Sequence, residues 1–220
     1  MPTAPLPALS LLETRVLGVL VEKQHTVPDS YPLTLNALVS GCNQKTSRHP
    51  VLEATEAEAQ AALDHLKSLS LVVESSGGRV MRYAHNAGRA LGLPGPSVAL
   101  LATLMLRGPQ TAGELRINSE RLHAFTDISA VEAFLEELAS RPAGALVAEL
   151  SRLPGTRETR WAHLLSGAPA EPAAPEAAAS PAQAASLGEI AALKANVDRL
   201  EAEVADLRET LARVVRELGL

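Results

Sequence analysis

The stretch from Tyr31 to Val51, YPLTLNALVSGCNQKTSRHPV, decides the fold of this chain. Pro32 cannot sit inside a helix, but it suits the turn just before one. Thr34 can cap the helix that follows. An apolar stripe then runs along that helix at Leu35, Leu38 and Val39. The stretch therefore predicts a short helix that packs one face against a core.

A polar and cationic run follows this helix, which Gly41 is suited to end. The run extends from Asn43 to Pro50 and reads NQKTSRHP. The next helix is expected to begin near Thr55, because Thr55-Glu56-Ala57-Glu58 has the spacing of a capping box. Two helices joined by about a dozen polar residues indicate a helix-turn-helix with an unusually long connection.

Several motifs around this stretch carry a resemblance to a known family. They are Arg15-Val-Leu-Gly18, Val21-Glu22-Lys23, Thr26-Val-Pro28, Tyr31 to Leu38, Cys42 to Arg48, and Pro50-Val51. Together they resemble the YceH family of bacterial proteins over roughly residues 9–165. The resemblance implies two tandem winged-helix domains. It implies no substrate, because the family has no established biochemical activity.

The first winged-helix domain is expected at residues 9–91, after a Pro-rich and flexible N-terminus at residues 1–8. Three helices followed by a β-hairpin make up such a domain. Besides the short helix above, the predicted elements are helices from Ser10 to about Gln24 and from about Thr55 to Ser70, and strands at Leu71–Glu74 and Arg79–Ala84.

The same pattern then repeats, which predicts a second winged-helix domain at residues 97–165, beginning with an apolar helix at Ser97–Arg107. Three pairs of matching segments, at offsets of 77, 72 and 78 residues, carry the repeat: Thr34–Leu38 with Thr111–Leu115, Ala61–Leu66 with Ala133–Leu138, and Arg82–His85 with Arg160–His163. The smaller middle offset means that the connection between the second and third helices is shorter in the second domain.

The C-terminal part has a different composition. Residues 166–185 are rich in Ala and Pro and are expected to form a semi-extended linker. Residues 186–220 predict a coiled-coil helix that makes a parallel homodimer, since apolar residues recur there with alternating spacings of three and four. The alternative is an amphipathic helix that packs on its own domains. The dimerisation residues are Ile190, Leu193, Val197, Leu200, Val204, Leu207, Leu211, Val214 and Leu218.

Composition narrows the class of protein. The chain has 220 residues and is 46% hydrophobic but only 2% aromatic, so its cores must be built from Leu, Val and Ala. Its one cysteine excludes a disulfide framework and a cysteine-based zinc site, and it fits a reducing cytoplasm. No apolar run is long enough to predict a membrane span. Cores of Leu, Val and Ala suit small helical domains, and together with the predicted strands they indicate a fold class that is mainly α with small β-hairpins.

Residues that could carry enzymatic chemistry do not form a recognised constellation. No phosphate-binding glycine loop is present, and the six histidines are scattered. Cys42 lies beside cationic residues that could lower the pKa of its thiol. The simpler interpretation is that Cys42 is a small residue packed at the end of a helix. His85 and His163 occupy matching positions, which suggests packing. We therefore expect no catalytic residue, no cofactor and no metal site.

Basic residues on the connections and hairpins favour binding to the phosphates of double-stranded DNA. They are Lys45, Arg48, His49, Arg79, Arg82, Arg116, Arg121, Arg157 and Arg160. The third helices carry acidic residues that phosphates would repel, and residues 1–165 hold 15 Lys and Arg against 16 Asp and Glu. Ordinary solvated surface charge is the competing reading of these residues. We expect a DNA-binding, regulatory protein; the alternative is a scaffold that uses its winged helices to bind a partner protein.

Overall fold

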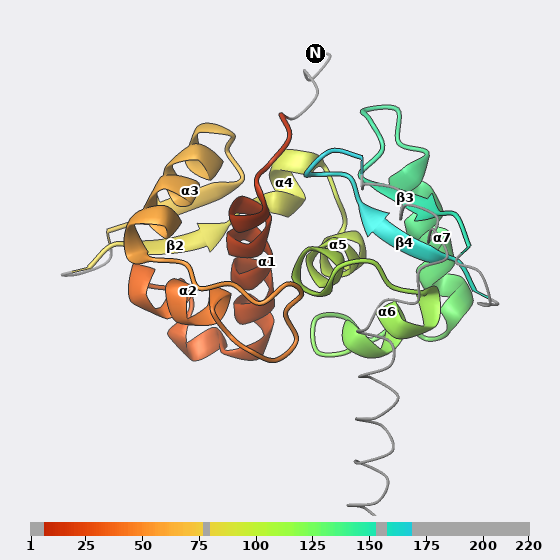
Figure 1. Ribbon diagram of the computed structural model, residues 1–220, viewed down its shortest axis with the longest axis horizontal. Coiled ribbons are helices and arrows are strands. Elements are labelled where there is room, and N and C mark those ends of the chain that lie inside the picture. Colours follow the sequence, from red (N-terminus) through yellow and green to blue (C-terminus); the bar gives the residue numbers. More distant parts are fainter. Residues whose placement is uncertain (1–6, 77–79, 153–157, 169–220) are drawn as a thin grey trace, which may run out of the picture. The chain divides into compact units, whose positions relative to one another are not determined.

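The computed structural model describes residues 7–76, 80–152 and 158–168, all within one compact unit. The described part is mainly helical, with two small antiparallel hairpins, as in winged-helix-like proteins (Figure 1). Its elements form two copies of one pattern. The first copy comprises α1 (Leu11–Thr26), the short 3-10 helix η1 (Pro28–Ser30), α2 (Leu35–Cys42), α3 (Glu56–Ser68), β1 (Val72–Ser75) and β2 (Arg82–His85).

The second copy repeats this order after a short connecting helix, α4 (Ala87–Leu91), which the sequence pattern did not predict. It comprises α5 (Gly95–Arg107), α6 (Ala112–Asn118), α7 (Ile128–Ala139), β3 (Val147–Leu150) and β4 (Arg160–His163). The connection between its second and third helices spans residues 119–127, whereas the first copy uses residues 43–55. The predicted shortening of this connection is therefore confirmed.

Side-chain caps set the helix starts where the sequence predicted them. The hydroxyl of Thr34 accepts a hydrogen bond from the amide of Ala37 at 3.3 Å and begins α2. Ser10 and Thr55 each form a complete capping box with the glutamate three residues later, which fixes the starts of α1 and α3. Thr111 and Glu114 repeat that device at the start of α6.

Each hairpin gains a third backbone contact from the residues just before the second helix. Strands β1 and β2 pair with Val72 opposite His85, and β3 and β4 pair with Val147 opposite His163. Leu33 then bridges to Tyr83 in the first copy, and Gln110 bridges to Trp161 in the second. The return strand of each hairpin is therefore anchored to the start of α2 or α6 on one side and to the outer strand on the other.

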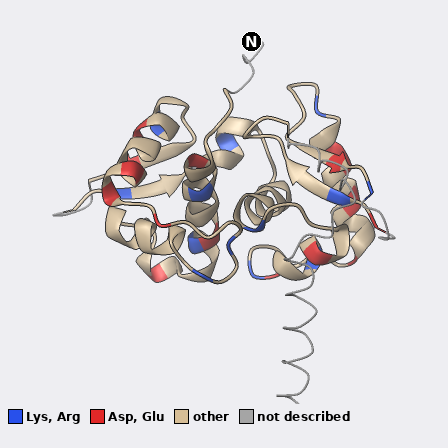
Figure 2. Ribbon diagram, in the orientation of Figure 1, with Lys and Arg blue, Asp and Glu red and all other residues tan. Residues whose placement is uncertain are grey.

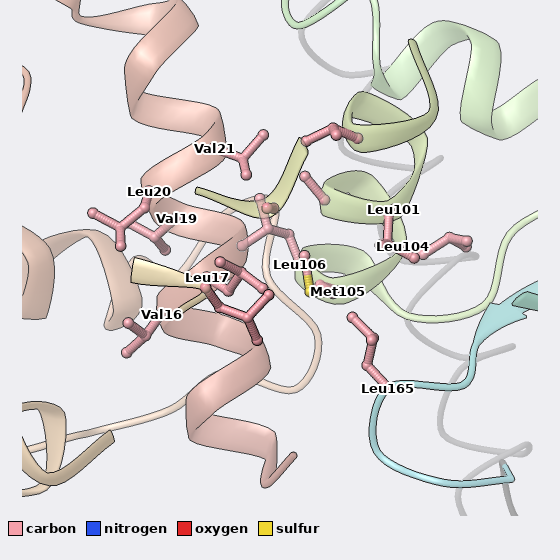
Figure 3. Close-up of a cluster of buried hydrophobic side chains, with 14 of the residues drawn as sticks. Val16, Leu17, Val19, Leu20, Val21, Leu101, Leu104, Met105, Leu106 and Leu165 are labelled. Carbon is pink, nitrogen blue, oxygen red and sulfur yellow. The ribbon is translucent and has the colours of Figure 1, made fainter. Parts of the chain in front are cut away.

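The two copies share one continuous hydrophobic core through the packing of α1 against α5. Figure 3 shows Leu17, Leu20 and Leu106 among the aliphatic side chains gathered there. Gly18 allows the close approach, because a Cβ atom at this position would lie 3.0 Å from Cγ of Leu106. The amide of Leu9 also donates a hydrogen bond to the carbonyl of Leu165 at 2.7 Å, tying the start of one copy to the end of the other.

Several predictions lie outside the described residues. These are the linker beyond residue 168, the coiled coil at residues 186–220 with all nine of its predicted dimerisation residues, and the hairpin residues Arg79 and Arg157.

Candidate nucleic-acid interface

The connection from Asn43 to Thr55 links the two copies as well as α2 and α3. The amide of His49 donates a hydrogen bond to the carbonyl of Leu106 at 2.8 Å, at the C-terminal end of α5. Nη2 of Arg107 reaches Oγ of Ser47 at 2.8 Å. The basic segment of the first copy, residues 43–50, therefore lies against the last turn of α5 in the second copy. This packing places Arg107 beside the basic segment.

Arg48 is buried, and this corrects the prediction that it contacts phosphate. Only 6% of the residue is exposed, and its Nη2 forms an ion pair with Oε2 of Glu22 at 2.6 Å. Its Nε donates to the carbonyl of Gly41 at 3.1 Å, and Nη2 also donates to Oε1 of Gln44 at 2.8 Å. The guanidinium holds the connection onto α1 and α2. A DNA phosphate could reach it only if these bonds broke.

A second buried guanidinium, Arg15 on α1, supports the other side of the same segment. It is fully buried, and its two terminal nitrogens donate to the carbonyls of Cys42 at 3.2 Å and Pro50 at 2.6 Å. Its Nε has no hydrogen-bond partner. Burial lowers the pKa of Arg15, and the nearby charge of Arg48 lowers it further. The segment is thus clamped at both ends by arginines that α1 and the segment itself supply.

Positive charge exceeds negative charge around the two arginines, Arg15 and Arg48, that hold the segment. Glu22 is shared by Arg48 and Lys23, whose Nζ lies 3.3 Å from Oε2 of Glu22. Burial favours the protonated form of Glu22, but the hydrogen bond and charge of Arg48 outweigh it and lower the pKa of Glu22. Arg15 is held by carbonyl oxygens instead of a carboxylate. The cluster therefore retains net positive charge beneath the segment.

Lys45 and His49 are the predicted contact residues of this segment that the structure leaves exposed. Both lie on backbone that Arg15 and Arg48 hold in place. Arg107 is half-buried beside them, and burial is the main cause of its lowered pKa. Sequence reasoning did not select Arg15, Glu22 or Arg107 for this site. The sequence did offer one indication of Arg15: it directly precedes the apolar residues of α1. An arginine that is buried there must find hydrogen-bond or charge partners.

Arg82 and Arg160, the matching hairpin residues, make matching bonds to backbone. Nη1 of Arg82 donates to the carbonyl of Pro32 at 2.8 Å, and Nη1 of Arg160 donates to the carbonyl of Pro109 at 3.2 Å. Arg160 also pairs with Glu114 at 3.3 Å. Both arginines therefore brace the hairpin against the residues before α2 or α6. Arg116 and Arg121 are exposed.

The third helices present carboxylates to solvent, as their sequences predicted. Figure 2 shows acidic residues along α3 and α7 and basic residues on the segments that join the helices. The exposed acidic residues are Glu56, Glu58 and Asp64 on α3, and Glu132, Glu136 and Glu137 on α7. A phosphate backbone would be repelled by these faces.

The cysteine is buried in the fold, and the two matching histidines are half-buried. Cys42 is fully buried, and burial raises the pKa of its thiol to about 12 despite the charges of Arg15 and Arg48. The pKa lowering that its neighbours suggested is therefore wrong. Burial lowers the pKa of His85 and of His163 to about 4, and Nδ1 of each lacks a hydrogen-bond partner. Both rings are accordingly neutral packing groups at pH 7.

Comparison with known proteins places the chain in a family. Residues 9–156 match the model of a protein of unknown function, DUF480. The chain belongs to this DUF480 family. The YceH family, which the motifs around Tyr31–Val51 resemble, is the same family.

Relatives of the DUF480 protein match it over nearly its whole length. It is 62% identical to a UPF0502 protein of Dechloromonas aromatica over 96% of this chain and 98% of the relative. It is 59% identical to a UPF0502 protein of Methylibium petroleiphilum over 99% of this chain and 93% of the relative. These names state no activity. In the described residues of the DUF480 protein, no helix is long and apolar enough to span a membrane.

Proposed function

We propose that this DUF480 protein is a non-enzymatic, cytoplasmic protein of two tandem winged-helix domains that binds double-stranded DNA and acts in transcriptional regulation. DNA binding would use the connection segment at residues 43–50, with Arg107 beside it, as the main phosphate contact. Arg116 and Arg121 are further contact candidates on the second copy, because both are exposed. The proposal assigns no contact to the acidic faces of α3 and α7.

The observation that carries this proposal is the clamped basic segment. Lys45 and His49 are exposed on backbone whose carbonyls are held by the buried guanidiniums of Arg15 and Arg48. A segment that is already ordered loses little conformational freedom when it binds. Arg48 is paired with Glu22, but the charge of Arg15 meets only carbonyl oxygens, so it adds to the attraction of Lys45 for a phosphate. Contacts of this kind position a protein on DNA without reading its sequence.

Dimerisation through residues 186–220 would strengthen such contacts. Each protomer offers only a few cations, and phosphate contacts made by one protomer are individually weak. Linking two protomers makes the second binding event intramolecular, so the weak contacts combine. The regular spacing of apolar residues from Ile190 to Leu218 supports this part of the proposal.

The test compares Lys45→Ala with a matched variant of an exposed arginine on α4, Arg89→Ala. We expect Lys45→Ala to weaken binding to random-sequence duplex DNA about equally for all sequences. The slope of log affinity against log salt should fall by about 1, the effect of losing one phosphate contact. Arg89→Ala should change neither quantity. Equal binding by Lys45→Ala and the unchanged protein, measured by fluorescence anisotropy, would show that the connection is not the contact site.

A protein-interaction scaffold is the second candidate function. The exposed carboxylates of α7 favour it, since that helix carries three glutamates and no basic residue. Such a helix suits a basic protein surface better than a nucleic acid.

A further inference from the structure

A groove of about 360 Å³ lies between the start of α6, helix α7 and the hairpin β3–β4. Trp161 and Ile128 contribute apolar surface to it, and Glu132, Glu136 and Glu149 contribute carboxylates. Ile128 is 46% exposed, whereas Trp161 is only 9% exposed. The groove therefore combines an exposed apolar side chain, Ile128, and a largely buried indole with concentrated negative charge.

The corresponding place in the first copy holds an internal ammonium, that of Lys67, whose side chain is partly exposed. Nζ of Lys67 lies 3.0 Å from Oδ1 of Asp64 and 2.6 Å from Oε2 of Glu74, joining α3 to β1. Gln60 donates to Asp64 at 3.1 Å and accepts a hydrogen bond from the hydroxyl of Tyr83 at 3.1 Å. These five side chains form one connected network in which the lysine offsets the carboxylates.

The second copy has carboxylates at the matching positions but no lysine at the position of Lys67. Helices α3 and α7 match at an offset of 72 residues, so Asp64 corresponds to Glu136 and Lys67 corresponds to Ala139. Gln60 corresponds to Glu132, which adds a further negative charge at that position. The strand registers place Glu149 where Glu74 stands, because Val147 faces His163 as Val72 faces His85. With Glu158, four carboxylates line the groove, and Arg152 is the one cation among the described residues that line it.

We propose that this groove binds a lysine or arginine side chain of a basic segment in a partner protein. The incoming ammonium or guanidinium would take the place that Lys67 fills in the first copy, between Glu136 and Glu149. Its aliphatic stem and charge would pack against the indole of Trp161, a surface that attracts cations. This proposal takes up the scaffold candidate and does not depend on DNA binding.

A lysine or arginine side chain fits the groove better than a metal ion or a phosphate. In the described part of the chain, no three or more His, Cys, Asp or Glu side chains are placed to hold a metal ion together. A phosphate would meet the carboxylates of α7 and be repelled. In the first copy an alkylammonium pairs with Asp64 and Glu74, the carboxylates that correspond to Glu136 and Glu149.

The groove contains the only tryptophan of the chain, so its emission reports binding at this place. The probe is an acetylated, amidated octapeptide of alternating Lys and Gly, titrated into the full-length protein at low salt; a Glu-Gly octapeptide serves as its control. We expect the Lys peptide to shift Trp161 emission in a saturable way and the Glu peptide to leave it unchanged. Absence of a shift with the Lys peptide would overturn the proposal.

Two variants test the site, with a third as the matched control. Ala139→Lys restores the internal ammonium and should weaken peptide binding at least about tenfold, while Glu136→Gln should weaken it about fivefold, the scale of one exposed ion pair. Glu137→Gln, an exposed glutamate outside the groove, should bind like the unchanged protein. Equal affinity of all three for a dye-labelled peptide would place binding elsewhere and contradict the proposal. Quenching of Trp161 by duplex DNA would also contradict it, because phosphate would then occupy the groove.

Discussion

Arg48 shows how the environment of one side chain decides what its charge can do. In the sequence it stands in a polar run between Ser47 and His49, where exposure to solvent is the natural expectation. In the structure it bonds the carbonyl of Gly41 and the carboxylate of Glu22. Glu22 lies 26 residues away, and nothing in the local sequence links the two residues. The cationic nature of the segment could be predicted from its residues, but which cation would be buried depended on this distant carboxylate.

Arg48→Ala should therefore act on stability before it acts on any ligand. It leaves Glu22 without its main partner, and breaking a buried ion pair costs about 3 kcal/mol of unfolding free energy. Lys45→Ala, on exposed backbone two residues after Asn43, should change the unfolding free energy by less than about 0.5 kcal/mol. Urea unfolding followed by circular dichroism measures both. A stable Arg48→Ala protein would mean that the pair with Glu22 contributes little to the fold.

At the scale of single elements, local sequence predicted helix starts better than helix contacts. The hydroxyls of Ser10, Thr34, Thr55 and Thr111 cap the helices that follow them, because capping depends on residues only three positions apart. The short helix α4 has no side-chain cap, and it was not predicted. The sequence predicted one apolar face for α1, but the structure buries all eight residues from Thr14 to Val21. Helix α1 is covered on all sides because α2, α3, β2 and α5 all pack against it.

Gly41 lies where α2 approaches α1 closely. A Cβ atom at this position would lie 2.6 Å from Cγ1 of Val19, a fully buried residue on α1. Gly41→Ala should therefore lower the unfolding free energy by about 2 kcal/mol through overpacking, despite the better helix propensity of alanine. Gly113→Ala is the control, since its nearest neighbour, Cδ1 of Ile128, would lie at an ordinary 3.9 Å. Thermal melts that rank Gly41→Ala as the more stable variant would contradict this assessment.

At the scale of the whole molecule, the α1–α5 contact makes the described residues one body. The repeat in the sequence predicted two equivalent copies, and the structure contains both patterns. The repeat could not predict how the copies meet, because their contact joins α1 to a helix some eighty residues later and has no counterpart within either copy. This contact is what brings Arg107 of one copy to Ser47 of the other. The proposed DNA site is thus a property of the pair of copies.

Assembly of two chains is a separate prediction at this scale, because the proposed coiled coil begins beyond the described residues. Truncation after Ala185 removes every predicted dimerisation residue. We expect the truncated protein to keep a helical circular dichroism spectrum and to be a monomer instead of a dimer, as measured by light scattering. An unchanged oligomeric state would show that the C-terminal segment does not dimerise the protein.

The most direct measurement of the central claim is a salt titration of the full-length protein against random-sequence duplex DNA, followed by fluorescence anisotropy. If the clamped segment and Arg107 contact phosphates, affinity should fall steeply and linearly on logarithmic axes as salt rises, because each contact releases counterions. Absence of binding even at about 50 mM salt, where electrostatic affinity is greatly enhanced, would contradict the claim. The protein would then have to be understood through its protein partners, beginning with the acidic groove on α7.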